Sequence, residues 1–247
     1  MELSAFFNEN PKAALAFSGG VDSAYLLCCA SKWAKDVTAY YVKSEFQPEF
    51  EYEDAQRLAK ELGARMKTIE LSVLDDENIS SNKADRCYHC KKKIFSAIAD
   101  AAAKDGYTLI IDGSNASDDA GDRPGMRATA ELKVRSPLRE CGLTKSAIRA
   151  LSKEAGLFIW DKPAYACLAT RVPTGEEITK EKLRKTKRSE EWLKSIGFSD
   201  FRIRLFGGAA RIQVKEEQLQ LLLEKREEII DRLRQDYSAV LLDLEVR

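Results

Sequence analysis

The chain has 247 residues, 44% of them hydrophobic, which suffices for one large domain or for a main domain with a smaller appendage. Its 40 basic and 40 acidic side chains cancel, and a net charge of zero gives no overall electrostatic attraction to nucleic acid. No apolar run approaches the roughly 18 residues of a membrane span, and the first residues do not resemble a signal peptide. We therefore expect a cytoplasmic protein without a membrane partner, for which the charge balance disfavours a nucleic-acid partner without excluding a local basic patch. Its six cysteines are expected to be thiols or metal ligands rather than disulfides.

Strand-like and helix-like segments alternate through the first two-thirds of the chain. Short runs with β-branched or aromatic residues predict strands at 13–17, 37–42, 65–71 and 107–112. Helical stretches lie between them, at 21–34, 51–62 and 91–104. This alternation predicts parallel βαβ units and an α/β fold with a doubly wound parallel sheet. In such sheets, ligands bind beyond the carboxyl ends of the strands.

The character of the sequence changes after about residue 173. The expected elements are a charged helix, two strands joined by a pair of glycines, a second charged helix and a last strand, at 178–196, 201–206, 210–214, 216–235 and 240–244. They predict a small α+β unit. The expected domains are therefore residues 1–172, which contain the parallel sheet, and residues 173–247, which form the smaller domain.

The most informative motif, Ser18-Gly19-Gly20-Val21-Asp22-Ser23, joins the first strand to the first long helix. A glycine-rich turn and the free N–H groups of a helix N-terminus form a site for a polyphosphate. Ser18 and Ser23 add hydroxyl donors, and Asp22 is suited to a magnesium ion that bridges phosphates. The motif lacks the lysine of a Walker P-loop, which disfavours a kinase or GTPase. It resembles the pyrophosphate loop (PP-loop) of the N-type ATP pyrophosphatases.

A second polar segment follows the fourth predicted strand. It reads Asp112-Gly113-Ser114-Asn115. Because the carboxyl ends of parallel strands meet at one edge of the sheet, we expect it to face the same crevice as the glycine turn.

Three of the six cysteines form a pattern. Cys87 and Cys90 make a C-x-x-C before a predicted helix, and Cys167 lies far downstream. Such a pair can chelate a metal, form a redox disulfide or supply two ligands of an iron–sulfur cluster. Zinc is disfavoured because there is no second pair and His89 is the only histidine. The same scarcity of histidine argues against Ser-His-Asp or Cys-His catalysis.

Arginines and acidic residues form the remaining candidates. Several arginines occupy predicted loops or strands, namely Arg123, Arg127, Arg171, Arg202 and Arg204. Guanidinium groups suit carboxylates and phosphates, so these residues indicate a multiply anionic substrate, although each of them can equally be a solvated surface charge. Glu190 and Glu191, on the charged helix of the second domain, are candidate metal ligands.

Several segments together resemble one family, the LarE-type ATP-dependent sacrificial sulfur transferases of nickel-pincer nucleotide biosynthesis. They are the PP-loop, residues 112–119 with Arg123-Pro124-Gly125, and the cysteine segment at 163–171. The resemblance extends over nearly the whole chain. It implies an enzyme that adenylylates both carboxylates of a pyridinium biscarboxylic acid mononucleotide with Mg-ATP, releases AMP and pyrophosphate, and forms thiocarboxylates. It also implies a homo-oligomer, trimeric or hexameric.

The resemblance also assigns roles to residues. The residues expected to bind ATP and magnesium are Ser18, Gly19, Gly20, Asp22, Ser23, Gly113 and Arg123. The substrate would be bound by Arg171, Arg202 and Arg204. Cys167 matches the cysteine that attacks the acyl-adenylate and ends as dehydroalanine in the sacrificial enzymes.

The source of the sulfur stays open at this point. Some relatives hold a 4Fe–4S cluster on three cysteines, and Cys87, Cys90 and Cys167 fit that arrangement in number. Because three cysteines rather than one need explaining, the sequence favours the cluster slightly. Three other functions remain as alternatives: a tRNA-thiolating PP-loop enzyme, an ammonia-dependent synthetase of the NAD or GMP synthetase type, and a nucleotide-binding module without turnover.

Overall fold

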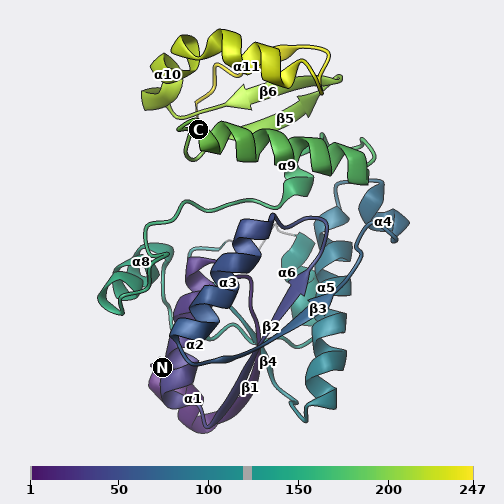
Figure 1. Ribbon diagram of the computed structural model, residues 1–247. Coiled ribbons are helices and arrows are strands. Elements are labelled where there is room, and N and C mark those ends of the chain that lie inside the picture. The colour runs from purple at the N-terminus through teal and green to yellow at the C-terminus, as the bar shows by residue number, and fades with distance from the viewer. Residues whose placement is uncertain (1, 119–123, 247) are drawn as a thin grey trace. The chain divides into compact units, whose positions relative to one another are not determined.

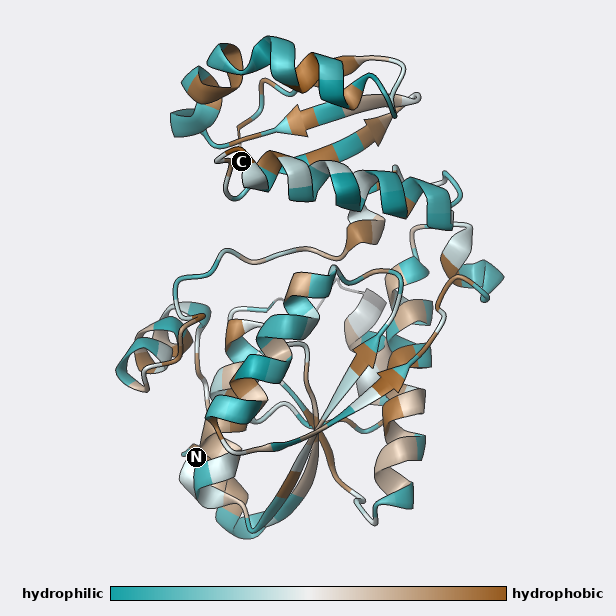
Figure 2. Ribbon diagram, viewed as in Figure 1, coloured by the Kyte–Doolittle hydropathy of each residue, from teal (hydrophilic) through white to brown (hydrophobic). Residues whose placement is uncertain are grey.

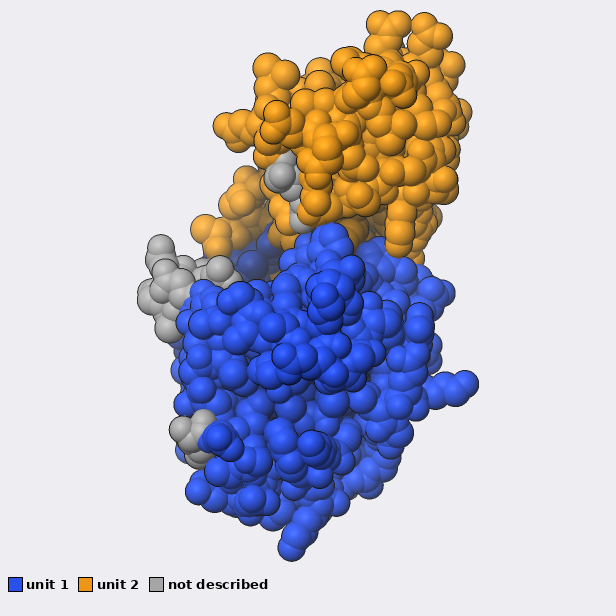
Figure 3. Space-filling view, turned by 90° about the vertical axis from the view of Figure 1, so that its left-hand side faces the viewer, with its two compact units in different colours: residues 1–73, 85–164 blue, residues 74–84, 165–247 orange. Residues whose placement is uncertain are grey.

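The computed structural model describes residues 2–118 and 124–246, which are drawn as a ribbon in Figure 1. The chain forms two compact units, coloured separately in Figure 3. Unit 1 comprises Met1–Val73 and Asp85–Ala164, and unit 2 comprises Leu74–Ala84 and Tyr165–Arg247. The predicted functional domains, 1–172 and 173–247, are not the same division and stay a prediction.

Unit 1 is built on a parallel sheet in the order β3-β2-β1-β4. Its strands are β1 (Lys12–Ala16), β2 (Asp36–Lys43), β3 (Arg65–Glu70) and β4 (Ile110–Asp112). The chain proceeds outward from β1 to β3 and then returns to add β4 on the other side of β1. This reversal makes the sheet doubly wound, as predicted, and puts the topological switch point between β1 and β4.

The fourth strand is shorter than predicted. Its ladder with β1 covers only three residues, and Tyr107 precedes it. The Tyr107 hydroxyl donates to Asp36 (2.9 Å) and shares a hydrogen bond with Thr38 (2.8 Å). Tyr107 therefore packs beside the sheet through its side chain, not as part of the ladder.

Helices cover both faces of this sheet (Figure 1). On one face lie α1 (Leu3–Glu9), α2 (Val21–Trp33) and α3 (Glu49–Glu61), and on the other lie α5 (Arg86–Lys104) and α6 (Pro124–Glu131). The short α7 (Pro137–Glu140) and α8 (Lys145–Glu154) complete the unit. Among the described helices, none combines the length and apolar character needed to cross a bilayer.

The two-residue period of β1 explains the two layers of core. Ala13 and Leu15 pack in the cluster formed with α1 and α2, whereas Ala14 packs with Tyr40 and Ile98 on the opposite face. Successive side chains of a strand point to opposite faces, so a continuous apolar run is what a sheet covered on both sides requires.

Helix α5 begins five residues earlier than predicted, so the C-x-x-C lies inside the helix rather than before it. The Asp85 carbonyl accepts from the Tyr88 N–H (2.9 Å) and starts the first turn. The Tyr88 ring is buried, and its hydroxyl donates to Glu131 on α6 (2.8 Å). This packing extends the buried face of the helix back through a charged stretch that showed little apolar periodicity.

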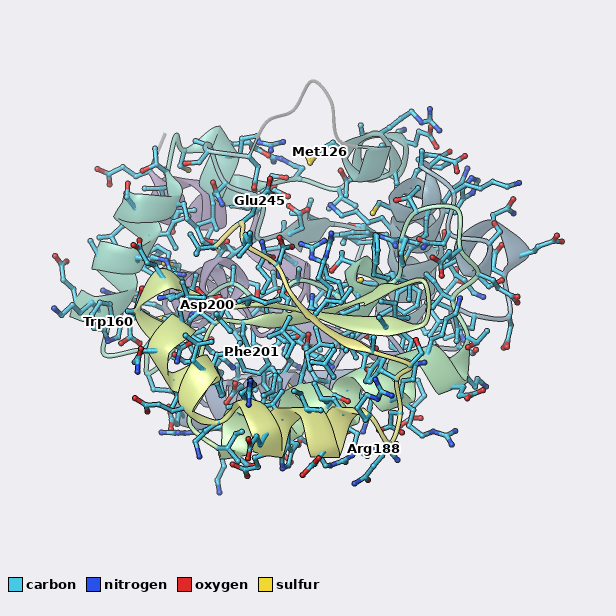
Figure 4. The ribbon with its side chains drawn as sticks, turned by 90° about the horizontal axis from the view of Figure 1, so that it is seen from above. Met126, Trp160, Arg188, Asp200, Phe201 and Glu245 are labelled. Atoms are coloured by element: carbon cyan, nitrogen blue, oxygen red, sulfur yellow. The ribbon has the colours of Figure 1, made fainter. Side chains whose placement is uncertain are left out.

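Unit 2 contains a three-stranded sheet in the order β5-β6-β7. Its elements are α9 (Lys180–Ser195), β5 (Arg202–Phe206), β6 (Ala209–Gln213), α10 (Leu219–Glu224), α11 (Arg226–Leu233) and β7 (Val240–Leu242). Strands β5 and β6 are antiparallel and are joined by Gly207 and Gly208, which both have positive φ, as the predicted hairpin requires. Figure 2 shows α9 as hydrophilic along most of its length. Figure 4 labels Asp200 and Phe201, which lead into β5.

Two differences from the sequence-based expectations concern unit 2. The single helix expected at 216–235 is a 3-10 turn (Glu216–Gln218) followed by two helices that break at Lys225. The unit also includes a segment from the first half of the chain, which carries α4 (Glu77–Ser80). Its Asn82 amide donates to the carbonyls of Val172 (3.2 Å) and Pro173 (2.7 Å), a pairing across 90 positions that sequence patterns do not reveal.

Candidate active site

In the glycine turn after β1, the position of Gly19 favours glycine over every other residue. Gly19 has φ +76°, and a Cβ there would lie 3.0 Å from the Cβ of Ala55 and 3.2 Å from the carbonyl oxygen of Glu51. The Ser18 and Ser23 hydroxyls lie 3.1 Å apart, and Ser23 also donates to the Gly20 carbonyl (3.0 Å). No side chain of the described residues caps α2 at Gly20. The turn therefore has the features of an anion site at a helix N-terminus.

The loop after β4 lies directly against the start of α2. A Cβ at Gly113 would lie 2.8 Å from the Ser23 nitrogen and 3.0 Å from its Cα, so the two backbones are in contact. This confirms the prediction that the segments after the first and fourth strands face the same place. They meet at the switch point, where ligands of doubly wound sheets bind.

Asp112 holds the loop after β4 in shape. Its buried carboxylate accepts from the Ser136 hydroxyl (2.7 Å), from the Ser114 hydroxyl (2.8 Å) and from the Ser114 N–H (3.1 Å). A carboxylate with these three donors fixes the backbone that brings Gly113 against α2. Its role here is structural.

Asp22 is placed to take a cation. It is the second residue of α2, where the helix dipole favours a negative charge. One carboxylate oxygen, Oδ2, contacts the Lys145 ammonium, and the other, Oδ1, is buried with no hydrogen-bond partner among the described residues. A buried oxygen of this kind fits the oxygen-ligand preference of Mg²⁺, so the residues present suit the predicted metal. Sequence analysis missed Lys145, whose contact with Asp22 spans 123 positions.

Replacing Gly113 with alanine tests this arrangement. The added methyl group would meet backbone atoms of Ser23, which cannot move aside without shifting α2. We expect the KM for ATP to rise roughly tenfold or more, because ångström-scale displacement of positioning groups costs up to about 10²-fold. Gly63→Ala is the control: its Cβ would meet nothing within 4 Å, so it should cost only stability. An unchanged KM in Gly113→Ala would contradict the assignment.

The C-x-x-C pair occupies the first two turns of α5. Cys87 is exposed and Cys90 half-buried, and the Arg86 guanidinium donates to the Cys87 sulfur (3.4 Å). Three residues apart on a helix, the two thiols share a face. Cys167 belongs to unit 2, and the described part of the chain contains no gathering of three His, Cys, Asp or Glu side chains able to hold a metal. Arg123, the predicted ATP ligand, lies outside the described residues.

The other three cysteines are core or boundary residues. Burial raises the pKa of the Cys29 thiol to about 12, and burial also raises the pKa of Cys28 and of Cys141. Thiols held in the protonated form are poor nucleophiles and poor metal ligands. Their surroundings agree with a packing role for Cys28 and Cys29.

In unit 2, the segment around Cys167 is held by its own backbone. The Cys167 carbonyl accepts from the N–H (3.0 Å) and the hydroxyl (2.9 Å) of Thr170, at the start of a 3-10 turn (Leu168–Arg171). Arg171 donates to the Ala166 carbonyl (3.0 Å). Leu168 is buried directly after the half-buried cysteine. The Cys167 backbone is therefore fixed, while its thiol is partly accessible.

A buried ion pair links this segment to the rest of unit 2. Arg171 binds Glu190 on α9 through Nε (2.7 Å) and Nη2 (3.1 Å), with the two side chains 1% and 6% exposed. Glu190 also accepts from the Tyr165 hydroxyl (2.5 Å) and from the Ile203 N–H (3.0 Å). Burial alone lowers the pKa of Arg171, but Glu190, Tyr165 and Cys167 outweigh it and raise that pKa.

This geometry bears on two of the predicted roles, those of Glu190 and Arg171. Four hydrogen bonds occupy both carboxylate oxygens of Glu190, which favours a structural role over the predicted metal site. The Arg171 guanidinium is likewise engaged in binding Glu190 and the cysteine segment, so it positions that segment, and its part in substrate binding stays a prediction. Glu191 lies exposed on α9 and pairs with Lys187 (3.8 Å).

The predicted arginines of β5 share one face of the second sheet. Arg202 and Arg204 alternate with the buried Ile203, and the register puts Arg211 of β6 directly opposite Arg204. Arg211 also forms an ion pair with Asp243 (3.3 Å). Like charges facing each other across a sheet are destabilising, and on this arginine face Asp243 offsets the charge of Arg211. Sequence analysis gave Arg211 no role, because the pairing depends on the register.

The parallel sheet, the strand–glycine turn–helix and the adjoining β4 loop define unit 1 as a PP-loop domain of the α/β class. In agreement, the family described as queuosine biosynthesis protein QueC matches residues 12–93. The chain is 34% identical over 219 residues to the pyridinium-3,5-bisthiocarboxylic acid mononucleotide synthase of Lactiplantibacillus plantarum, covering 88% of this chain and 79% of that protein. It therefore belongs to the family of that synthase, the LarE-type PP-loop proteins, which confirms the resemblance found in its motifs.

Two further relatives cover similar lengths. An uncharacterized protein of Synechocystis sp. is 38% identical over 226 residues, which are 90% of this chain and 83% of the relative. An uncharacterized protein of Methanocaldococcus jannaschii is 30% identical over 239 residues, which are 96% and 91% of the two chains. In all three cases the similarity extends across both units.

Proposed function

We propose that this protein is an ATP-dependent sulfur transferase that converts the two carboxylates of pyridinium-3,5-biscarboxylic acid mononucleotide into thiocarboxylates. The family supports this substrate, because the named relative is a pyridinium-3,5-bisthiocarboxylic acid mononucleotide synthase. The reaction would serve nickel-pincer nucleotide biosynthesis. One observation carries the proposal beyond the PP-loop class: the Arg171–Glu190 ion pair joins the Cys167 segment to Ile203, between the two arginines of β5.

The first half-reaction belongs to unit 1. ATP would lie at the glycine turn, with its phosphates on the N-terminus of α2 and on the hydroxyls of Ser18 and Ser23. Asp22 would hold Mg²⁺, which supplies charge neutralisation to the phosphates when it is bound. The proposed step is attack of a substrate carboxylate oxygen on the α-phosphorus, with pyrophosphate as leaving group. Gly113 contributes by allowing the β4 loop to approach the same place.

The second half-reaction uses sulfur from Cys167. Its thiolate would attack the carbonyl carbon of the acyl-adenylate, forming a thioester and expelling AMP with the former carboxylate oxygen. Loss of the Cys167 Cα proton and cleavage of its Cβ–S bond would then release the thiocarboxylate and leave dehydroalanine. The fixed backbone at Cys167 supports this role, because a positioned nucleophile lowers the entropic cost of the attack.

The arginine face would bind the anionic groups of the substrate. Arg202 and Arg204 are suited to its phosphate, since guanidinium groups bind phosphate oxygens in pairs. Arg211 extends the same face and would add to the positive potential there.

Other predictions for this enzyme remain open proposals. A 4Fe–4S cluster on Cys87 and Cys90 of unit 1 and Cys167 of unit 2 is the alternative source of sulfur. A homo-oligomer, trimeric or hexameric, is likewise proposed from the family resemblance alone.

Anaerobic turnover followed by intact-mass analysis tests the proposal. With Mg-ATP and the pyridinium substrate, we expect AMP, pyrophosphate and thiocarboxylate, and a polypeptide that has lost the mass of one hydrogen sulfide at Cys167. An unchanged polypeptide containing iron and labile sulfide would replace the sacrificial route with the cluster route. ADP and phosphate as products, or a carboxamide formed from ammonia, would contradict the proposed function. So would pyrophosphate release that depends on tRNA.

A further inference from the structure

The PP-loop aspartate has a counter-ion from a distant helix. Lys145 is the first residue of α8, and its ammonium contacts Oδ2 of Asp22 at the start of α2. The side chains of Lys145 and Asp22 are 36% and 20% exposed. The pair therefore lies at the margin of the proposed ATP site, with the lysine the more accessible partner.

The surroundings of Lys145 fix its position. Its backbone N–H donates to the Ser117 hydroxyl (3.0 Å) in the loop after β4. The Thr144 hydroxyl caps α8 by accepting from the Ala147 N–H (3.3 Å), and the Ala116 N–H donates to the Leu143 carbonyl (2.8 Å). The β4 loop, which also presents Gly113, thus holds the lysine beside the glycine turn.

Helix stability does not account for a lysine at this position. A cation in the first turn of a helix meets the positive end of the helix dipole, which costs about 0.3–1 kcal/mol. The ion pair with Asp22 offsets this cost only partly, because it leaves the buried Oδ1 without a partner among the described residues. The unfavourable position of Lys145 and the missing partner of Oδ1 are both relieved if a metal ion binds Asp22 and an anion binds Lys145.

A positively charged side chain beside the glycine turn would help to neutralise a polyphosphate there. The glycine turn of this chain has no equivalent of the Walker lysine. We propose that Lys145 is a phosphate-binding cation of the ATP site: it neutralises Asp22 before nucleotide binds, and turns to the phosphates when Mg²⁺ takes its place. This inference rests on the proposed function, since it deepens the role of the same site.

The chain offers a matched ion pair for comparison. Lys162 contacts Asp54 within unit 1, and their side chains are 34% and 26% exposed. Asp54 lies in α3, and neither of its carboxylate oxygens is among the buried atoms without a partner in the described residues. If Lys145 only stabilised the fold, its replacement should affect nucleotide binding no more than the replacement of Lys162 does.

Nucleotide binding without chemistry gives the first test. Equilibrium dialysis with α,β-methylene-ATP, which cannot be cleaved between its α and β phosphorus atoms, at saturating Mg²⁺ measures nucleotide binding in the state in which Lys145 has been released from Asp22. Lys145→Gln is expected to weaken binding roughly 10- to 100-fold, the range for losing a hydrogen bond to a charged group, whereas Lys145→Arg should retain most of the affinity. Lys162→Gln should bind as tightly as the wild type. An unchanged affinity in Lys145→Gln, or an equal loss in Lys162→Gln, would overturn the proposal.

Metal binding gives a second test, in which Lys145→Gln is expected to raise the affinity rather than lower it. With Mn²⁺ alone as the probe, followed by electron paramagnetic resonance, Lys145→Gln should bind the ion several-fold more tightly, because the competing ammonium is gone. Asp22→Asn should lose this site. Weaker or unchanged Mn²⁺ binding in Lys145→Gln would count against the exchange of cations, and failure of this variant to fold would mean that the lysine is structural.

The two readouts are separate from the proposed sulfur transfer. Neither contains the carboxylate acceptor, so a failure to form thiocarboxylate would leave both results standing. If the wild type bound no nucleotide at all, the proposed function and the role of Lys145 would both be overturned.

Discussion

Replacing Cys167 with alanine should abolish thiocarboxylate formation while leaving pyrophosphate release intact for the first turnover. The alanine has no sulfur to attack the acyl-adenylate, whereas the ATP residues lie on other segments, in unit 1. We expect product formation to fall at least roughly 10³-fold, the scale on which removal of a nucleophile acts. Quantifying thiocarboxylate by mass spectrometry and pyrophosphate by a coupled assay separates the two half-reactions.

Cys141→Ala is the matched control for this experiment. Cys141 is a half-buried free thiol, and burial raises its pKa, so it should be dispensable for both half-reactions. Full thiocarboxylate formation by Cys167→Ala would contradict the role of Cys167 under either sulfur source.

The second large effect concerns the ion pair beneath Cys167. Arg171→Ala should lower the free energy of unfolding of unit 2 by about 3–5 kcal/mol, because it leaves the buried Glu190 carboxylate without its counter-charge. Replacing both Arg171 and Glu190 with methionine should cost much less, since no buried charge then remains. Urea denaturation followed by tryptophan fluorescence measures the change, with Trp192 of α9 reporting on this unit.

An exposed pair in the same unit provides the control. Arg226 and Glu227 lie 3.2 Å apart at the surface, and Arg226→Ala should change stability by less than about 1 kcal/mol. Equal effects of Arg171→Ala and Arg226→Ala would show that the buried pair does not stabilise the cysteine segment.

Much of the fold follows from local pattern. The apolar runs of β1 and β2 predicted buried parallel strands because both faces of the sheet are covered, as the packing of Leu15 and Tyr40 on opposite faces confirms. The start of α5 was misplaced because Tyr88 and the Glu131 that it contacts lie 43 positions apart. Such a contact leaves no periodicity in the charged residues around it.

The same distinction between local pattern and contacts of distant residues applies to the candidate site. The glycine turn was predictable because its residues are adjacent in the chain and their chemistry is local. The contacts of Lys145 with Asp22 and of Glu190 with Arg171 join residues 123 and 19 positions apart, and the opposition of Arg204 and Arg211 depends on strand register. Sequence patterns identify chemical groups, whereas the fold decides which of them bind substrate and which hold the others in place.

In the proposed reaction, ATP activates a carboxylate by transferring AMP to it. Substrate labelled with a heavy oxygen isotope in both carboxylates tests this directly by mass spectrometry of the released nucleotide. We expect AMP that carries one labelled oxygen for every thiocarboxylate formed. Unlabelled AMP, or ADP in its place, would contradict it.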